Sequence, residues 1–141
     1  LLSTILPHET THVILAGRFG AYDLPRWADE GIATLSEPQE RRDLFERYLI
    51  QARRQGQLFR LSQLMRMPDW PRNREDITVF YAQSLSLVDF LVKKKGPTIF
   101  ARFLATGLNS SMAGALKRIY GWESFEELQR EWLASLPRGR E

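Results

Sequence analysis

The sequence predicts a mainly α-helical fold, and two features of its 141 residues carry that prediction. Apolar residues recur at three- and four-residue spacing along most of the chain, whereas the alternation of a half-buried strand is scarce. Glycine, proline and capping residues divide these amphipathic stretches into helices of ordinary length. With 43% hydrophobic and 26% charged residues, the chain has the composition of one globular domain.

The first two helices are expected near the N-terminus. Residues 3–16 form the first, and Pro7 is tolerated there if it lies in the first turn, where its missing N–H has no helical partner. The second covers about residues 24–36, with Asp23 as its N-cap and Pro25 just inside it.

The middle of the chain combines one clear helix with an irregular stretch. Residues 39–55 form a charged amphipathic helix that ends at Gly56, and residues 61–66 form a short helix. Residues 67–71 cannot be helical throughout, because each of their two prolines restricts itself and the residue before it. We interpret this segment as a surface connection, with the lining of a binding groove as the alternative.

The last half of the chain is again helical. Amphipathic stretches separated by Gly96-Pro97 and by Gly121 predict helices over residues 75–95, 98–106 and 110–120. Ser124 and Glu127 form a capping box for a final helix that ends near Leu136. We therefore expect one helical domain over residues 1–136 and a frayed tail at 137–141.

A metal-ligand pattern lies in the first predicted helix. The chain has two histidines, His8 and His12, and Glu9 directly follows the first. Residues four apart lie on the same face of a helix, so both imidazoles can reach one metal ion, while Glu9 points to the side of it. This H-E-x-x-H pattern is typical of zinc peptidases, in which the glutamate is the general base.

Two histidines are too few for a catalytic zinc ion, which has three protein ligands and an open position for water. The chain has no cysteine and no third histidine, so the third ligand must be a carboxylate. A candidate is Glu30, in the stretch Trp27-Ala28-Asp29-Glu30-Gly31-Ile32-Ala33. Gly31 and Ala33 are small enough to let this helix cross the motif helix closely.

Taken together, His8-Glu9-x-x-His12 and the W-x-x-E-G-x-A element from Trp27 to Ala33 resemble the gluzincin metallopeptidases. The form of the second element is similar to that of peptidase MA-like domains, which are related to the M1 aminopeptidases. The resemblance implies that His8, His12 and Glu30 bind Zn²⁺, and it favours Glu30 over Asp29. The interval between the two elements is one residue shorter here, within a glycine-containing loop.

The resemblance extends to Tyr81, which opens the long helix and is similar to the tyrosine of the aminopeptidase Y-x-x-G segment. In that family the tyrosine donates a hydrogen bond to the tetrahedral intermediate, which implies the same role for Tyr81. Ser84 replaces the family's glycine. The G-x-M-E-N element that grips a free substrate amine is absent from the sequence.

The expectation is therefore the helical catalytic part of a zincin-like peptidase that acts on peptide or protein substrates. Gluzincins carry a β-sheet before the motif helix, and this chain opens almost inside that helix, so we expect it to be part of a longer protein. One alternative is an inactive domain that binds zinc or peptide. A second is a helical interaction module in which H-E-x-x-H occurs by chance.

The charge and hydropathy of the sequence limit the classes of partner that we expect. The formal net charge of +3 comes from scattered basic residues, which favours solvated helix faces over a nucleic-acid surface. The sequence shows neither a signal peptide nor the about 20 consecutive apolar residues of a membrane span. Members of the resembling family are often exported or attached to the cell envelope, but the sequence itself leaves the compartment and any membrane association of the longer protein open.

Overall fold

The computed structural model describes residues 24–137, and within that range every regular element is helical. The helices, in chain order, are α2 (Arg26–Leu35), α3 (Gln39–Arg54), α4 (Leu61–Leu64), α5 (Arg74–Lys95), α6 (Pro97–Asn109), α7 (Met112–Ala115), the π-helical turn η1 (Leu116–Tyr120) and α8 (Phe125–Ser135). The mainly α-helical class is thus confirmed for this part of the chain.

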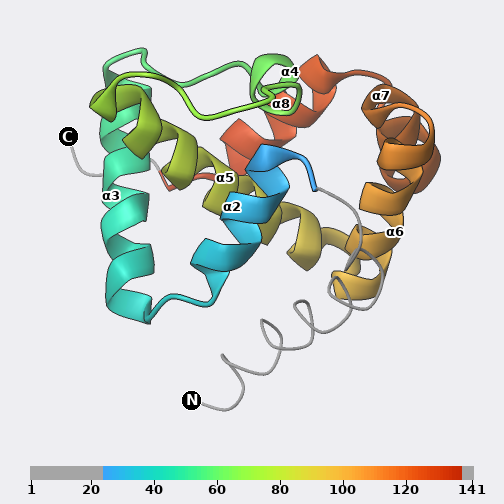
Figure 1. Ribbon diagram of the computed structural model, residues 1–141, viewed down its shortest axis with the longest axis horizontal. Coiled ribbons are helices and arrows are strands. Elements are labelled where there is room, and N and C mark those ends of the chain that lie inside the picture. Colours follow the sequence, from blue (N-terminus) through green and yellow to red (C-terminus); the bar gives the residue numbers. More distant parts are fainter. Residues whose placement is uncertain (1–23, 138–141) are drawn as a thin grey trace.

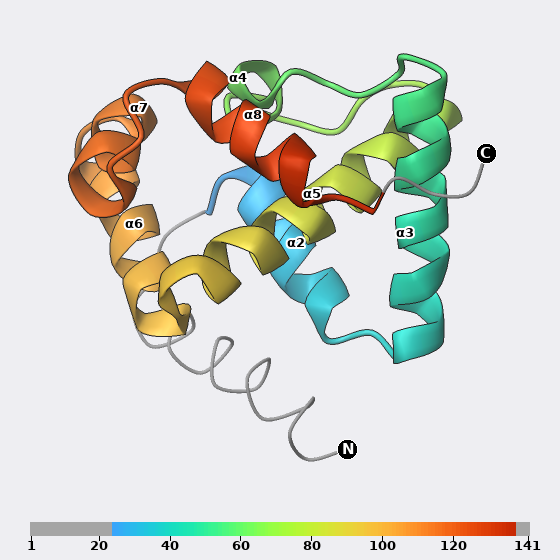
Figure 2. The same cartoon turned by 180° about the vertical axis from the view of Figure 1, so that it is seen from behind.

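The long helix α5 runs through the middle of the molecule. Helix α2 crosses one face of it in Figure 1, and α8 lies on the opposite face, which Figure 2 shows from behind. Helix α3 packs beside its N-terminal half, while α6 and α7 stand at its other end. Because α5 is surrounded, residues on several of its sides are buried, including Phe80, Leu87 and Leu91.

The crossing of α2 and α5 is unusually close at one residue. A Cβ atom built on Gly31 would lie 2.4 Å from Val88 Cγ2 and 2.5 Å from the backbone oxygen of Ser84. Only glycine fits between these two helices at that point. From the sequence, we expected Gly31 to allow a close crossing with the helix that carries the H-E-x-x-H motif. Among the described residues, α5 is the helix that approaches Gly31 closely.

Ala33, which was paired with Gly31 in that prediction, is exposed. It therefore takes no part in the approach of α2 to α5.

Side-chain caps fix the starts of several helices, and the cap of α8 is the one that the sequence predicts. Asn73 accepts a hydrogen bond from the backbone N–H of Asp76 at the start of α5, and Ser124 accepts one from Glu127 at the start of α8. Pro25 occupies the N-cap position of α2 rather than the first turn. The largest difference in length is in α6, which continues to Asn109 because Gly107 does not interrupt it.

The segment between α3 and α5 is irregular but anchored. Gln83 of α5 is fully buried, and its side-chain amide both donates to the backbone oxygen of Phe59 (2.9 Å) and accepts from the Phe59 N–H (2.7 Å). The backbone N–H of Leu61 donates to Gln129 of α8. These bonds satisfy buried backbone groups that have no helical partner. They also hold the start of the segment against the core.

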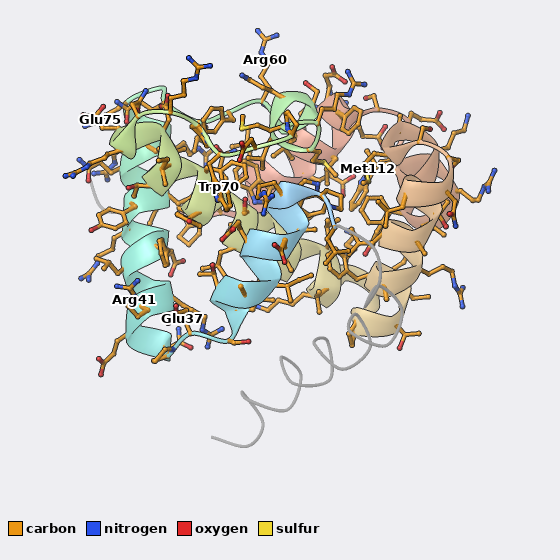
Figure 3. All side chains as sticks on the ribbon, in the orientation of Figure 1. Glu37, Arg41, Arg60, Trp70, Glu75 and Met112 are labelled. Atoms are coloured by element: carbon orange, nitrogen blue, oxygen red, sulfur yellow. The ribbon has the colours of Figure 1, made fainter. Side chains whose placement is uncertain are left out.

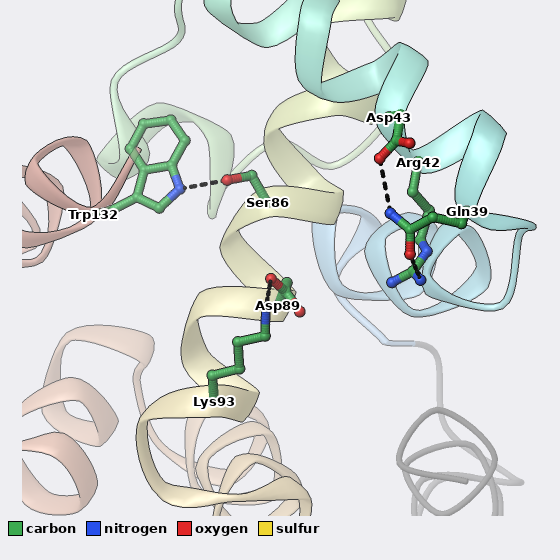
Figure 4. Close-up of polar contacts among 7 residues, drawn as sticks. All are labelled: Gln39, Arg42, Asp43, Ser86, Asp89, Lys93 and Trp132. Atoms are coloured by element: carbon green, nitrogen blue, oxygen red, sulfur yellow. Dashed lines mark hydrogen bonds and ion pairs between the residues drawn. The ribbon is translucent and has the colours of Figure 1, made fainter. Parts of the chain in front are cut away.

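On the side of α5 where α3 and α8 meet it, polar side chains bond to one another (Figure 4). The Trp132 indole N–H donates to Ser86 Oγ at 2.9 Å, and Lys93 pairs with Asp89 one turn earlier at 2.9 Å. Gln39 donates to Asp43 in the first turns of α3. The contacts between α8 and α5 therefore include a buried indole with a satisfied N–H.

Two predictions fall partly or wholly outside the described residues. The helix predicted over residues 3–16, with its histidines, lies outside them. Of the predicted tail, Pro137 is described and exposed, and residues 138–141 lie outside. Between residues 24 and 137 no helix has both the length and the apolar character that crossing a membrane requires.

Replacing Gly31 with alanine should destabilise the fold by about 1–3 kcal/mol, because the new methyl group would overlap the backbone of Ser84. Urea unfolding followed by circular dichroism measures the change. The matched control is Gly107→Ala in α6, whose Cβ would meet only the flexible end of Met112. That variant should change stability by less than about 1 kcal/mol. Equal losses in the two variants would contradict the close-crossing interpretation.

Candidate functional site

The structure describes two of the five predicted site residues. His8, Glu9 and His12 lie outside the described residues, whereas Glu30 and Tyr81 lie within them. Within residues 24–137 no group of three or more histidine, cysteine or acidic side chains is arranged to hold a metal ion. In the described part of the chain the proposed site is therefore represented by Glu30, Tyr81 and their neighbours.

Glu30 lies in the middle of α2, directly before Gly31, and its side chain is half-buried. Thr34, one turn later, donates its hydroxyl to the Glu30 backbone oxygen at 2.7 Å rather than to the Glu30 carboxylate. Asp29 is exposed and pairs with Arg26 at 3.6 Å. The two neighbouring acids thus have different surroundings, and Glu30 is the one that faces the protein.

Tyr81 lies in the second turn of α5 and is also half-buried. Its ring contacts Phe45 of α3, with 6.4 Å between the ring centroids, and it lies against the neighbouring Phe80. These aromatic contacts hold the ring on the α3 side of α5. The phenol oxygen is thereby kept in the neighbourhood of Glu30.

Trp70 lies near these two residues, in the segment that we interpreted from the sequence as a surface connection, with the lining of a binding groove as the alternative. It lies on the segment before α5, beside α2 in Figure 3, and 41% of its surface is exposed. Its side chain is near enough to both Glu30 and Tyr81 to favour the charged form of each.

Arg26 completes the cluster from the first turn of α2. Its guanidinium lies over the Trp70 ring, 4.1 Å from the centroid, a cation–π contact. Arg26 and Glu30 are four residues apart and therefore lie on one face of α2. This spacing is the signal in the sequence that could have pointed to Arg26, whereas nothing local places Trp70 beside that face.

The surroundings of Glu30 disfavour its negative charge. Burial raises the pKa of the Glu30 carboxyl above its ordinary value, and the nearby charge of Asp29 adds to the effect. The donor group of the nearby Trp70 side chain and the charge of Arg26 act to lower this pKa but do not cancel the increase. A carboxylate in this situation gains more from a bound cation than one in free solution.

The same neighbourhood acts on Tyr81. Burial raises the pKa of its phenol, and the negative charge of Glu30 raises it further. Tyr81 is therefore held in its protonated form, able to donate a hydrogen bond. A carboxylate and a phenol that influence one another across two helices form a small polar site between α2, α5 and the Trp70 segment.

A second hollow, between α3, α5 and the end of α8, has a volume of about 440 Å³. Its polar lining includes Asp43, Asp89 and Lys93, whose contacts with one another and with Gln39 are drawn in Figure 4. Asp89 and Lys93 compensate one another and Asp43 accepts from Gln39, so most of the charge named here is bonded within the protein. The Glu30 and Tyr81 cluster is the stronger candidate.

Comparison with models of known protein families, with curated proteins and with solved structures gives no match to this chain.

Replacing Glu30 with glutamine should stabilise the metal-free protein at neutral pH. When the pKa of a carboxyl is higher in the folded than in the unfolded protein, the stability of the protein falls as the pH rises from about 4.5 through the folded pKa. Glutamine does not ionise, so the variant avoids that loss of stability. The gain should therefore shrink as the pH falls below about 4.5. Urea unfolding in the presence of a chelator, repeated across this pH range, measures it.

The control for this prediction is Glu46→Gln, which changes an exposed glutamate in the middle of α3. Glu46→Gln should give no comparable gain at neutral pH. If Glu30→Gln destabilises the metal-free protein at neutral pH, our conclusion that the Glu30 carboxylate is desolvated is wrong.

Proposed function

We propose that this chain is the helical catalytic part of a zinc-dependent peptidase of the gluzincin type. The observation that supports it most is the pairing of Glu30 with Tyr81. The sequence resemblance gives these residues the roles of third zinc ligand and oxyanion donor. They come from helices far apart in the chain, yet the Glu30 charge acts on the Tyr81 phenol and Trp70 lies near both residues.

The donor set fits zinc. Two imidazoles and one carboxylate make up the His₂Glu ligand set of catalytic zinc sites, which leaves a fourth position for water. Glu30 meets the requirement for the third ligand because it is partly desolvated and lies at an accessible edge of α2. When bound, zinc lowers the pKa of a water molecule and polarises the carbonyl of the peptide bond to be cut.

The remaining chemistry belongs to residues of this chain. Glu9 accepts the proton of the attacking water and then delivers it to the nitrogen of the departing amine. Tyr81 keeps its proton and donates a hydrogen bond to the oxyanion that develops on the former carbonyl. His8 and His12 remain neutral so that each can offer a nitrogen lone pair as ligand.

The cluster also bears on the two alternatives. An interaction module with a chance H-E-x-x-H gives no reason for a half-buried carboxylate and a phenol with a raised pKa to lie together. An inactive zinc-binding domain needs Glu30 but not Tyr81. The presence of both favours catalysis, and two experiments separate the possibilities.

Zinc content is the first test. Glu30→Ala should lose most of the bound zinc, because two histidines alone hold the ion poorly, whereas Asp29→Ala should retain it. Elemental analysis of the purified full chain after dialysis against zinc measures the content. Asp29 is the matched control, since it is the adjacent acid but is exposed and paired with Arg26. Retention of zinc by Glu30→Ala together with loss in Asp29→Ala would reassign the third ligand.

Turnover is the second test. Glu9→Gln should keep the zinc but abolish hydrolysis of a peptide substrate, because glutamine cannot accept the proton of the water. Hydrolysis of a mixed peptide library, followed by mass spectrometry with and without a chelator, measures activity. The longer parent protein should be assayed alongside the chain, since the resemblance places a substrate-binding sheet before the motif helix. Undiminished turnover in Glu9→Gln would remove the general-base assignment, and zinc binding without hydrolysis by the parent would favour the inactive domain.

A further inference from the structure

An open hollow lies beside the short helix α4 and has a volume of about 520 Å³. Its lining residues are Arg60, Ser62, Gln63, Arg66, Met67 and Pro68. The four polar side chains among them all carry hydrogen-bond donors, and none of the six lining residues is acidic. The hollow is therefore basic, with an apolar part formed by Met67 and Pro68.

The positive charge of this hollow is not neutralised within the described part of the chain. No carboxylate between residues 24 and 137 lies within ion-pair distance of Arg60 or Arg66. The acid nearest to them in the sequence, Asp69, accepts the backbone N–H of its neighbour and does not line the hollow. The hydroxyl and amide side chains of the hollow make no hydrogen bond within the same range either. All these donors are thus available to a bound group.

The structure also holds this hollow against the core. Leu61 and Leu64 of α4 are fully buried, and the Leu61 N–H donates to Gln129 of α8 at 2.9 Å. The Arg66 guanidinium lies 5.0 Å from the centroid of the Phe125 ring, a cation–π contact. That contact uses the face of the guanidinium and leaves the N–H groups in its plane free for an anion. Because Arg66 is already oriented, less side-chain entropy is lost when a ligand binds.

We propose that this hollow binds the oxyanion of a small ligand, a phosphate or a carboxylate group. A guanidinium presents its donors in a planar fork that matches two oxygens of such a group. Because Arg60 and Arg66 line the same hollow, one anion can accept from both, with the Ser62 hydroxyl as a neutral donor. An apolar part of the ligand rests on Met67 and Pro68. The site is independent of the proposed zinc centre.

Binding is tested on the full chain by NMR titration with three probes of similar size: phenyl phosphate, benzoate and the neutral benzyl alcohol. The backbone amide resonances of residues 60–67 should shift saturably with at least one of the two anions and stay in place with the alcohol. Binding of phenyl phosphate alone identifies a phosphate site, binding of benzoate alone a carboxylate site, and equal binding a site for either group. Shifts with none of the probes, or equal shifts with the alcohol, would overturn the proposal.

Variants with matched charge separate this site from a general attraction of anions to a basic protein. Arg60→Gln and Arg66→Gln should each weaken binding about tenfold or more, because each removes a charged donor. Arg102→Gln removes the same charge from the exposed surface of α6 and should change the affinity less than about twofold. Equal losses in all three variants would overturn the proposal.

The folded state of each variant can be checked independently. Arg60 is exposed and its side chain makes no bond within residues 24–137, so Arg60→Gln should keep the wild-type spectrum outside the hollow. It remains a test even if the loss of the Phe125 contact destabilises Arg66→Gln. The readout is anion binding and requires neither zinc nor hydrolysis, so either result leaves the proposed peptidase function as it stands.

Discussion

The close crossing of α2 and α5 at Gly31 is the constraint on which the candidate site depends. Glu30 directly precedes Gly31, and Tyr81 lies one turn before Ser84, whose backbone oxygen meets Gly31. Separating the helices by the width of a methyl group would therefore move Glu30 away from Tyr81. The packing of Gly31 against α5 thus also sets the spacing between Glu30 and Tyr81, the two described residues with proposed roles in the site.

Burial also explains why the site is electrostatically unusual. A carboxylate that a fold exposes to water has no reason to be sensitive to a neighbouring phenol. Glu30 is sensitive because the protein replaces part of its water and compensates it only in part, through the nearby Trp70 and the guanidinium of Arg26. This incomplete compensation is typical of groups retained for binding rather than for stability.

The sequence predicts the helices well because each is ended by residues with a local mechanism. Gly96 and Gly121 both have positive φ, and Ser124 caps α8 as its spacing with Glu127 indicates. The partner of Gly31 could not be predicted, since small size shows that something comes close but not which helix. The roles of His8, Glu9 and His12 stay predictions. Trp70 was missed because its partners are distant in the chain and its own segment has no periodicity.

The anchoring of the Trp70 segment has a consequence for motion. The segment is attached to α5 near both of its ends, through the Gln83 amide at Phe59 and through the Asn73 cap. The Trp70 segment and the phenol of Tyr81 are thus both attached to α5, while the Arg26 contact also joins the Trp70 ring to α2. A displacement of α2 relative to α5 would therefore change the position of Glu30 relative to Tyr81, and at Gly31 no side chain separates the two helices.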